Sequence, residues 1–148
     1  MQHINPALQD AILKYLRQNG VCTTEMETFM EANSNFVTLL HDMARLTNEK
    51  NRASMDYAKQ QRDCDARHKV FSLEAQLKIV ERIQETESAY EERRRSAMLH
   101  ATTLLNLWPK LDHQLQQHNM YRNVVANCAN AARTQFPLLD AAATAKPS

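Results

Sequence analysis

Glycine is almost absent from this chain: it occurs once in 148 residues, against a usual share of about 7%. Phosphate-cradling loops, dinucleotide-binding folds and type I′ hairpins depend on glycine, so nearly all of these devices are excluded. Prolines, with four, and aromatic residues, at 6%, are also scarce. We therefore predict an all-α chain, in which the glycine-dependent enzyme folds have no place.

A strong net charge, a cysteine framework and a long apolar run are missing as well. The chain carries 18 Lys and Arg against 17 Asp and Glu, and this formal charge of +1 gives no strong attraction for nucleic acid. Three cysteines without a C-x-x-C pair indicate reduced thiols in a cytoplasmic or nuclear protein. No stretch approaches about 18 consecutive apolar residues, and no signal-peptide pattern begins the sequence. We expect a cytoplasmic protein without a membrane span.

Residues 1–33 are predicted to form an N-terminal helical hairpin. Asn5 suits an N-cap, Pro6 suits the first helical position, and Asn19 with Gly20 supplies a left-handed helix end. Because apolar residues spaced three or four apart share a helix face, the first helix should present one apolar stripe to a partner. The residues of this N-terminal stripe are Leu8, Ile12, Tyr15 and Leu16.

Helix-forming residues continue far beyond this hairpin. A second helix should start at Thr23 or Thr24, where Thr24 and Glu27 have the spacing of a capping box. Residues 34–107 contain no glycine or proline, which predicts a long, coiled-coil-like segment of one or two helices. Residues 59–69 lack a large apolar side chain, and the pattern leaves open whether the helix breaks there. It also leaves parallel and antiparallel pairing open.

Two apolar stripes with a 3–4 spacing are the predicted seams of the long segment. One runs from Phe36 to Tyr57. The other consists of Val70, Leu73, Leu77 and Val80. Pro109 costs about 3 kcal/mol inside a helix but is favourable in the first turn, so a turn or a sharp kink is predicted at Trp108 and Pro109. A C-terminal helix over residues 108–136 should then pack back, followed by a flexible tail over residues 137–148.

Residues that suggest chemistry are sparse. Cys64 and His68 would share a helix face, but two ligands make no zinc site without a symmetry-related pair. His113 and His118 are five residues apart and do not share a face. No G-x-S-x-G or H-E-x-x-H motif is present. We therefore predict no catalytic, cofactor-binding or metal-ligating residues, no cofactor and no enzymatic activity.

The N-terminal hairpin carries a recurrent pattern, formed by Leu8, Ile12, Leu13, Tyr15, Leu16, Asn19, Gly20, Thr24, Phe29 and Glu31. This pattern resembles the LisH motif of cytoskeletal and centrosomal adaptors over residues 8–31. The second half departs from it, because Val21 replaces an aromatic residue and Phe29 is one place late. LisH hairpins are dimerisation modules that often precede a coiled coil, so the resemblance implies a dimerising N-terminus.

The same segment is also similar to the first two helices of a winged-helix or helix-turn-helix domain. That resemblance implies DNA binding through a positively charged recognition helix. Residues 23–32 carry Glu25, Glu27 and Glu31 but no Lys or Arg, and no glycine-turned wing follows. No nucleic-acid partner is therefore expected.

These observations favour a non-enzymatic oligomerisation or adaptor subunit of a larger cytoplasmic assembly, for which the LisH resemblance suggests a cytoskeletal or centrosomal setting. Its protein partners, identical or different, would bind through the N-terminal stripe and the Val70 to Val80 stripe. One alternative is a secretion-type chaperone or effector-binding helical protein, because seven methionines suit an adaptable surface. A helix-turn-helix-like DNA-associated regulator is the second alternative.

Overall fold

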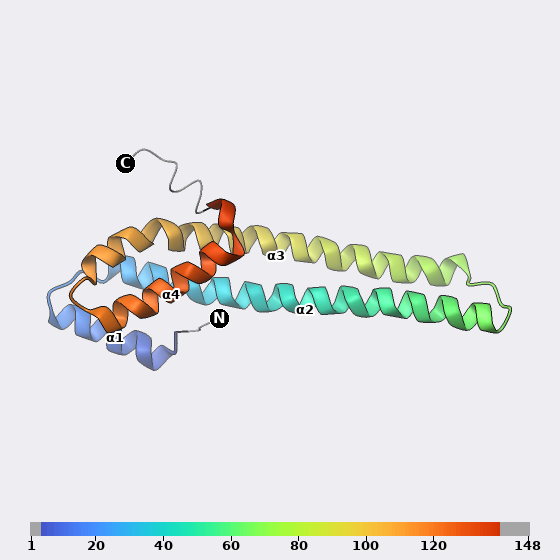
Figure 1. Ribbon diagram of the computed structural model, residues 1–148, viewed down its shortest axis with the longest axis horizontal. Helices are drawn as coiled ribbons and strands as arrows, with labels where there is room; N and C mark the ends of the chain where they lie inside the picture. The colour runs from blue at the N-terminus through green and yellow to red at the C-terminus, as the bar shows by residue number, and fades with distance from the viewer. Residues whose placement is uncertain (1–3, 140–148) are drawn as a thin grey trace. The chain divides into compact units, whose positions relative to one another are not determined.

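The protein is described by a computed structural model over residues 4–139, and in that range it has four long helices and no strand. They are α1 (Pro6–Gln18), α2 (Thr24–Ala66), α3 (Leu73–Gln114) and α4 (Asn119–Gln135), as Figure 1 shows. The all-α prediction is confirmed, with an N-terminal hairpin, two long helices and a C-terminal helix.

The chain divides into two compact units. Unit 1 contains residues 1–38 and 96–148, and unit 2 contains residues 39–95. The predicted boundaries after residues 33 and 107 fall inside α2 and α3, where the helices continue without a break. The compact units therefore do not correspond to separate helices, because α2 and α3 each contribute residues to both units.

Helix α1 begins and ends where its sequence predicts. The Asn5 side chain accepts a hydrogen bond of 2.8 Å from the Ala7 N–H. Gly20 takes the left-handed conformation with φ of 73°. The Val21 N–H then donates to the Leu16 carbonyl at 2.9 Å, which is the long bond of a Schellman motif. The single glycine is thus a helix terminator.

A second left-handed residue ends α2 without glycine. His68 has a φ of 54°, and the Lys69 N–H donates to the Cys64 carbonyl at 2.8 Å, again in a Schellman motif. A loop of residues 67–72, called the hairpin loop below, leads to α3. The Ser72 hydroxyl accepts from the Ala75 N–H at 3.2 Å and caps the new helix. The long segment is therefore two helices.

The predicted turn at Pro109 is wrong. Helix α3 runs through Pro109 to Gln114, and the reversal comes at residues 115–118. Burial of the surrounding leucines, about 1.5–3 kcal/mol for each side chain, outweighs the cost of about 3 kcal/mol for an interior proline. The buried leucines on either side are Leu104, Leu105, Leu111 and Leu115. The C-terminal helix is consequently α4 and starts eleven residues later than predicted.

Unit 1 contains an extensive apolar core. Its helices bring together the ten largest fully buried side chains described in the chain, which are Phe29, Phe36, Ile12, Leu16, Met26, Leu104, Leu111, Leu115, Val37 and Val125. Phe36 packs against Phe136, which follows α4, with ring centroids 6.3 Å apart. Helix α4 thus packs back as predicted. Of the predicted tail, residues 137–139 form a helical turn and residues 140–148 lie outside the described range.

Unit 2 is an antiparallel pair formed by the second half of α2 and the first half of α3, joined by the hairpin loop (Figure 1). Its α2 face follows the predicted 3–4 spacing, with Leu40, Met43, Leu46 and Ala53 buried. On α3 the only buried side chains in this unit are those of Ile79 and Thr86. The seam inside unit 2 is therefore narrow, and ion pairs border it.

Candidate interaction surface

An apolar stripe lies exposed at the loop end of unit 2. It consists of Val70, Leu73, Leu77 and Val80, and we call it the tip stripe. Their exposed fractions are 91%, 69%, 48% and 37%. Val70 lies in the hairpin loop and the other three lie on α3. Soluble proteins seldom leave so many large apolar side chains together in water unless the surface binds something.

These residues, predicted as a seam for a protein partner, do not form the seam with α2 inside the chain. Leu73, Leu77 and Val80 share one face of α3, whereas Ile79 and Thr86 share another face, about a third of a turn away. Both sets have the 3–4 spacing of a helix face. Tyr90 lies two helical turns before the buried Ala97, and steps of four and three residues lead from it to Thr86, Ile83 and Ile79. The face that contains Ile79 and Thr86 is therefore continuous with the buried face at Ala97. The tip stripe therefore remains outside the hairpin.

Polar contacts hold the antiparallel register of unit 2. The Lys50 ammonium lies 2.8 Å from the Glu87 carboxylate, and Arg93 Nε lies 3.6 Å from Asp42. Arg93 belongs to a run of three arginines, and its contact with Asp42 joins α3 to α2. These groups are largely exposed, so each pair contributes at most about 1 kcal/mol.

The hairpin loop is tied to α2 by a chain of hydrogen bonds. The Tyr57 hydroxyl donates to Gln76 Oε1 at 3.0 Å, and Gln76 Nε2 donates to the Phe71 carbonyl at 2.8 Å. The Tyr57 and Phe71 rings also pack with centroids 5.1 Å apart. These contacts fix where the loop leaves α2, and so place Leu73 and Leu77 on the outer surface.

The N-terminal stripe has a different environment. Ile12 and Leu16 are fully buried in the core of unit 1, and Leu8 is exposed at its edge. Tyr15 is half-buried, and its hydroxyl lies 2.9 Å from His118 Nδ1. The expectation that this stripe meets another chain is corrected, because Ile12 and Leu16 are buried within the chain itself.

Tyr15 of this stripe makes aromatic contacts with the start of α4 that the sequence did not indicate. The Tyr15 ring centroid lies 5.0 Å from those of both His118 and Tyr121. His118 is the N-cap residue of α4 and makes no capping hydrogen bond. Its side chain contacts Tyr15 instead, across 103 positions of sequence. No local signal relates these residues.

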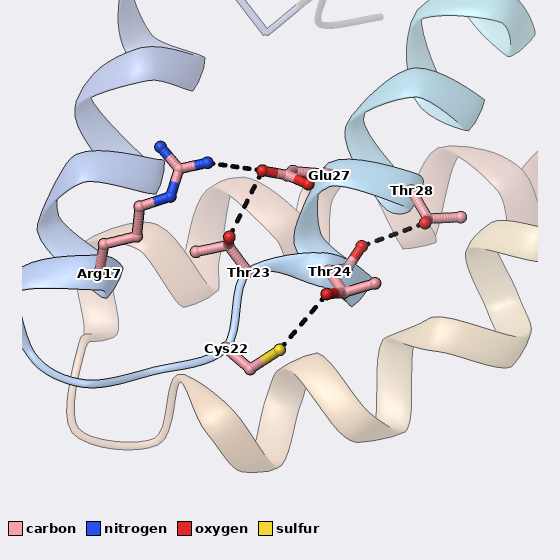
Figure 2. A network of polar contacts seen from close by, with 6 residues as sticks. All are labelled: Arg17, Cys22, Thr23, Thr24, Glu27 and Thr28. Carbon is pink, nitrogen blue, oxygen red and sulfur yellow. Dashed lines mark hydrogen bonds and ion pairs between the residues drawn. The ribbon is translucent and has the colours of Figure 1, made fainter.

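A polar network surrounds the start of α2, as Figure 2 shows. The Arg17 guanidinium of α1 contacts the Glu27 carboxylate at 2.6 Å, and the Thr23 hydroxyl donates to the same carboxylate at 3.4 Å. Glu27 thus joins the two helices of the hairpin, although Thr24 was its predicted partner. Cys22 Sγ lies 3.4 Å from the Thr24 hydroxyl. Hydrogen bonds from the Thr24 side chain and backbone lower the pKa of this exposed thiol.

The predicted helical pairing of Cys64 and His68 does not form. Helix α2 ends at Ala66, so His68 lies in the loop and leaves the face that carries Cys64. Between residues 4 and 139, no group of three or more His, Cys, Asp or Glu side chains is arranged to hold a metal ion. Cys128 is a buried thiol of the unit 1 core. Burial raises the pKa of Cys128 to about 11.

Comparison with known protein families, curated proteins and solved structures gave no match to this chain. Across the described residues, no helix combines the length and the apolar character needed to cross a membrane. The chemistry of the surface is therefore the basis for a functional interpretation, and its most distinctive feature is the tip stripe.

Proposed function

We propose that this chain is a non-enzymatic helical subunit that binds another protein through the tip stripe, as an adaptor or oligomerising element of a larger cytoplasmic assembly. The exposure of Leu73, Leu77 and Val80 on one helix face carries the proposal. Residues three and four apart on one face match the way one helix packs into the grooves of another.

The energy available at this surface is sufficient for association. Complete burial of a leucine or valine side chain contributes about 1.5–3 kcal/mol, and three such side chains are partly or largely exposed here. A partner helix that covers them would gain several kcal/mol before the cost of association. The resemblance of residues 8–31 to LisH hairpins supports the same class of function, with a cytoskeletal or centrosomal setting, although Ile12 and Leu16 of its apolar stripe are buried within the chain.

Site-specific photo-crosslinking tests this proposal. A photoreactive phenylalanine analogue replaces Leu77 in the full chain, which is then mixed with extract of the source cells. The matched control places the analogue at Asn48, an exposed position on α2. We expect one discrete adduct from position 77 that is lost when Leu73 and Val80 are changed to Ser.

The identity of the adduct, whether a second copy or a different protein, is read by mass spectrometry. An adduct that forms equally from position 48, or the lack of any adduct from position 77, would contradict an interaction surface at the tip stripe.

A further inference from the structure

The tip stripe places three apolar side chains of α3 on one helix face. Leu73 and Leu77 are four residues apart, and Leu77 and Val80 are three apart. When two α3 helices lie antiparallel about a two-fold axis beside Leu77, the two Leu77 side chains lie opposite each other, and Leu73 of each copy lies opposite position 81 of the other, one residue beyond Val80. Such an arrangement is self-complementary, as a two-fold interface requires.

The charges around the stripe are complementary in the same arrangement. Arg67 and Lys69 are exposed in the hairpin loop, and Glu81 and Glu85 are exposed one and two turns beyond Leu77. None of these four side chains forms an ion pair within the described part of the chain. Lys69 precedes Leu77 by eight residues and Glu85 follows it by eight.

Antiparallel pairing about Leu77 therefore brings the basic loop of each copy to the acidic turns of the other. Glu85 lies about 12 Å along the helix from Leu77, at a rise of about 1.5 Å per residue. In the opposing copy, the hairpin loop precedes Leu73, which is four residues before its own Leu77. The antiparallel arrangement places that loop on the same side of the two-fold axis as Glu85. Each dimer would contain this contact twice, once on either side of the axis.

Few apolar side chains are buried between the two helices at the tip of unit 2, so burial of the tip by a partner would be favourable. The last buried apolar residue of α2 is Ala53, and the first buried residue of α3 is Ile79. Between them and the loop, the residues at the seam are only half-buried, and they include Tyr57, Gln60, Cys64, Ala75 and Gln76. A second hairpin tip would add apolar contacts to the single ring contact that Tyr57 makes with Phe71 at this end of unit 2.

We infer that the tip of unit 2 is a homodimer interface, in which α3 packs antiparallel on α3 of a second copy about Leu77, flanked by contacts of Arg67 and Lys69 with Glu81 and Glu85. The inference rests on the proposed function and names its partner as a second copy of this chain. The surface is at the small end of specific interfaces, so a dissociation constant on the order of micromolar is expected.

Charge reversal in the purified full chain tests the arrangement. Sedimentation velocity over a concentration series should give a species of twice the chain mass of 17.1 kDa that dissociates on dilution. Lys69→Glu alone and Glu85→Lys alone should each weaken the dimer about tenfold, because two contacts become repulsive. An equimolar mixture of the two variants should restore it, because both contacts then join opposite charges.

Two further variants complete the design. Leu77→Lys places like charges beside the two-fold axis and should abolish the dimer in the same concentration range. Lys59→Glu reverses an exposed charge on α2 of the same unit and should leave the dissociation constant unchanged. Circular dichroism checks that each variant keeps its helical content, since all four sites are on the surface.

A chain that stays monomeric throughout, or a dimer that neither Leu77→Lys nor the charge reversals weaken, overturns the inference. Failure of the mixture to restore dimerisation also overturns it. The proposed function fails separately, when position 77 gives no specific crosslink to any protein.

Discussion

Units 1 and 2 place their apolar side chains differently. Among the described residues, unit 1 buries twenty apolar side chains and leaves four large ones exposed, whereas unit 2 buries five and exposes five. Unit 2 also holds twelve of the basic and eleven of the acidic residues of the chain. Unit 1 therefore carries most of the apolar stabilisation, whereas unit 2 leaves apolar side chains exposed that a partner could bury.

Truncation of a core residue of unit 1 should have the largest effect. Phe29→Ala removes a fully buried ring and should lower the free energy of unfolding by about 3–5 kcal/mol, because a cavity remains. Urea denaturation followed by circular dichroism measures the loss. Leu99→Ala, at a residue that is 71% exposed, is the matched control and should cost less than about 1 kcal/mol. Equal losses would contradict the distinction between core and surface.

High pH should weaken the unit 1 core through Cys128. Burial raises the pKa of this thiol from 9.0 to about 11, so the folded protein binds the proton more tightly than the unfolded chain. The stabilisation is complete below pH 9 and is lost as the pH rises through 11, by about 2–3 kcal/mol.

Unfolding free energies of the wild type and Cys128→Ala between pH 8 and 11 isolate this effect, because the other titrating groups are common to both. We expect a steeper fall with pH in the wild type. Cys22→Ala, which removes an exposed thiol, should retain that fall. Parallel curves for the wild type and Cys128→Ala would show that Cys128 ionises as freely in the folded chain as in the unfolded one.

The end of α2 in unit 2 should give the smallest effect, and in the opposite direction. His68→Gly removes the strain of a non-glycine residue in the left-handed backbone conformation. It also raises the conformational entropy of the unfolded chain, so the free energy of unfolding should rise by up to about 1 kcal/mol. Hydrogen exchange of the Lys69 amide, which bonds to the Cys64 carbonyl, should slow up to about fivefold. Ala66→Gly, inside the last helical turn, should accelerate it. Faster exchange in His68→Gly would contradict this explanation of the helix end.

The helix ends that the sequence predicts correctly are those with strong local signals. Asn5, Pro6 and Gly20 define α1 because each acts on the adjacent backbone. His68 and the turn at residues 115–118 carry no comparable signal, since neither contains glycine or proline. Pro109 carries a strong signal that the burial of leucines on both sides overrides.

The candidate surface was predicted as a set of residues, but the sequence did not show which face of α3 meets α2. Leu73 and Leu77 have the same 3–4 spacing as Ile79 and Ile83, so periodicity cannot decide which set faces α2. Packing decides it, because only one of two faces about a third of a turn apart can contact α2. For the N-terminal stripe, the sequence predicted an apolar face that needs a partner, and the fold buries Ile12 and Leu16 within the same chain.

In the proposed dimer, the tip stripe is open in a single chain and becomes covered on association, whereas Ile12 and Leu16 of the N-terminal stripe are covered throughout. Hydroxyl-radical footprinting over a dilution series measures both at once. We predict that oxidation of Leu73 and Leu77 is high in dilute protein and falls as the concentration rises, while Ile12 and Leu16 stay protected at every concentration. Protection of Leu77 at the lowest concentration, or oxidation of Leu73 and Leu77 that does not change with concentration, would contradict the claim.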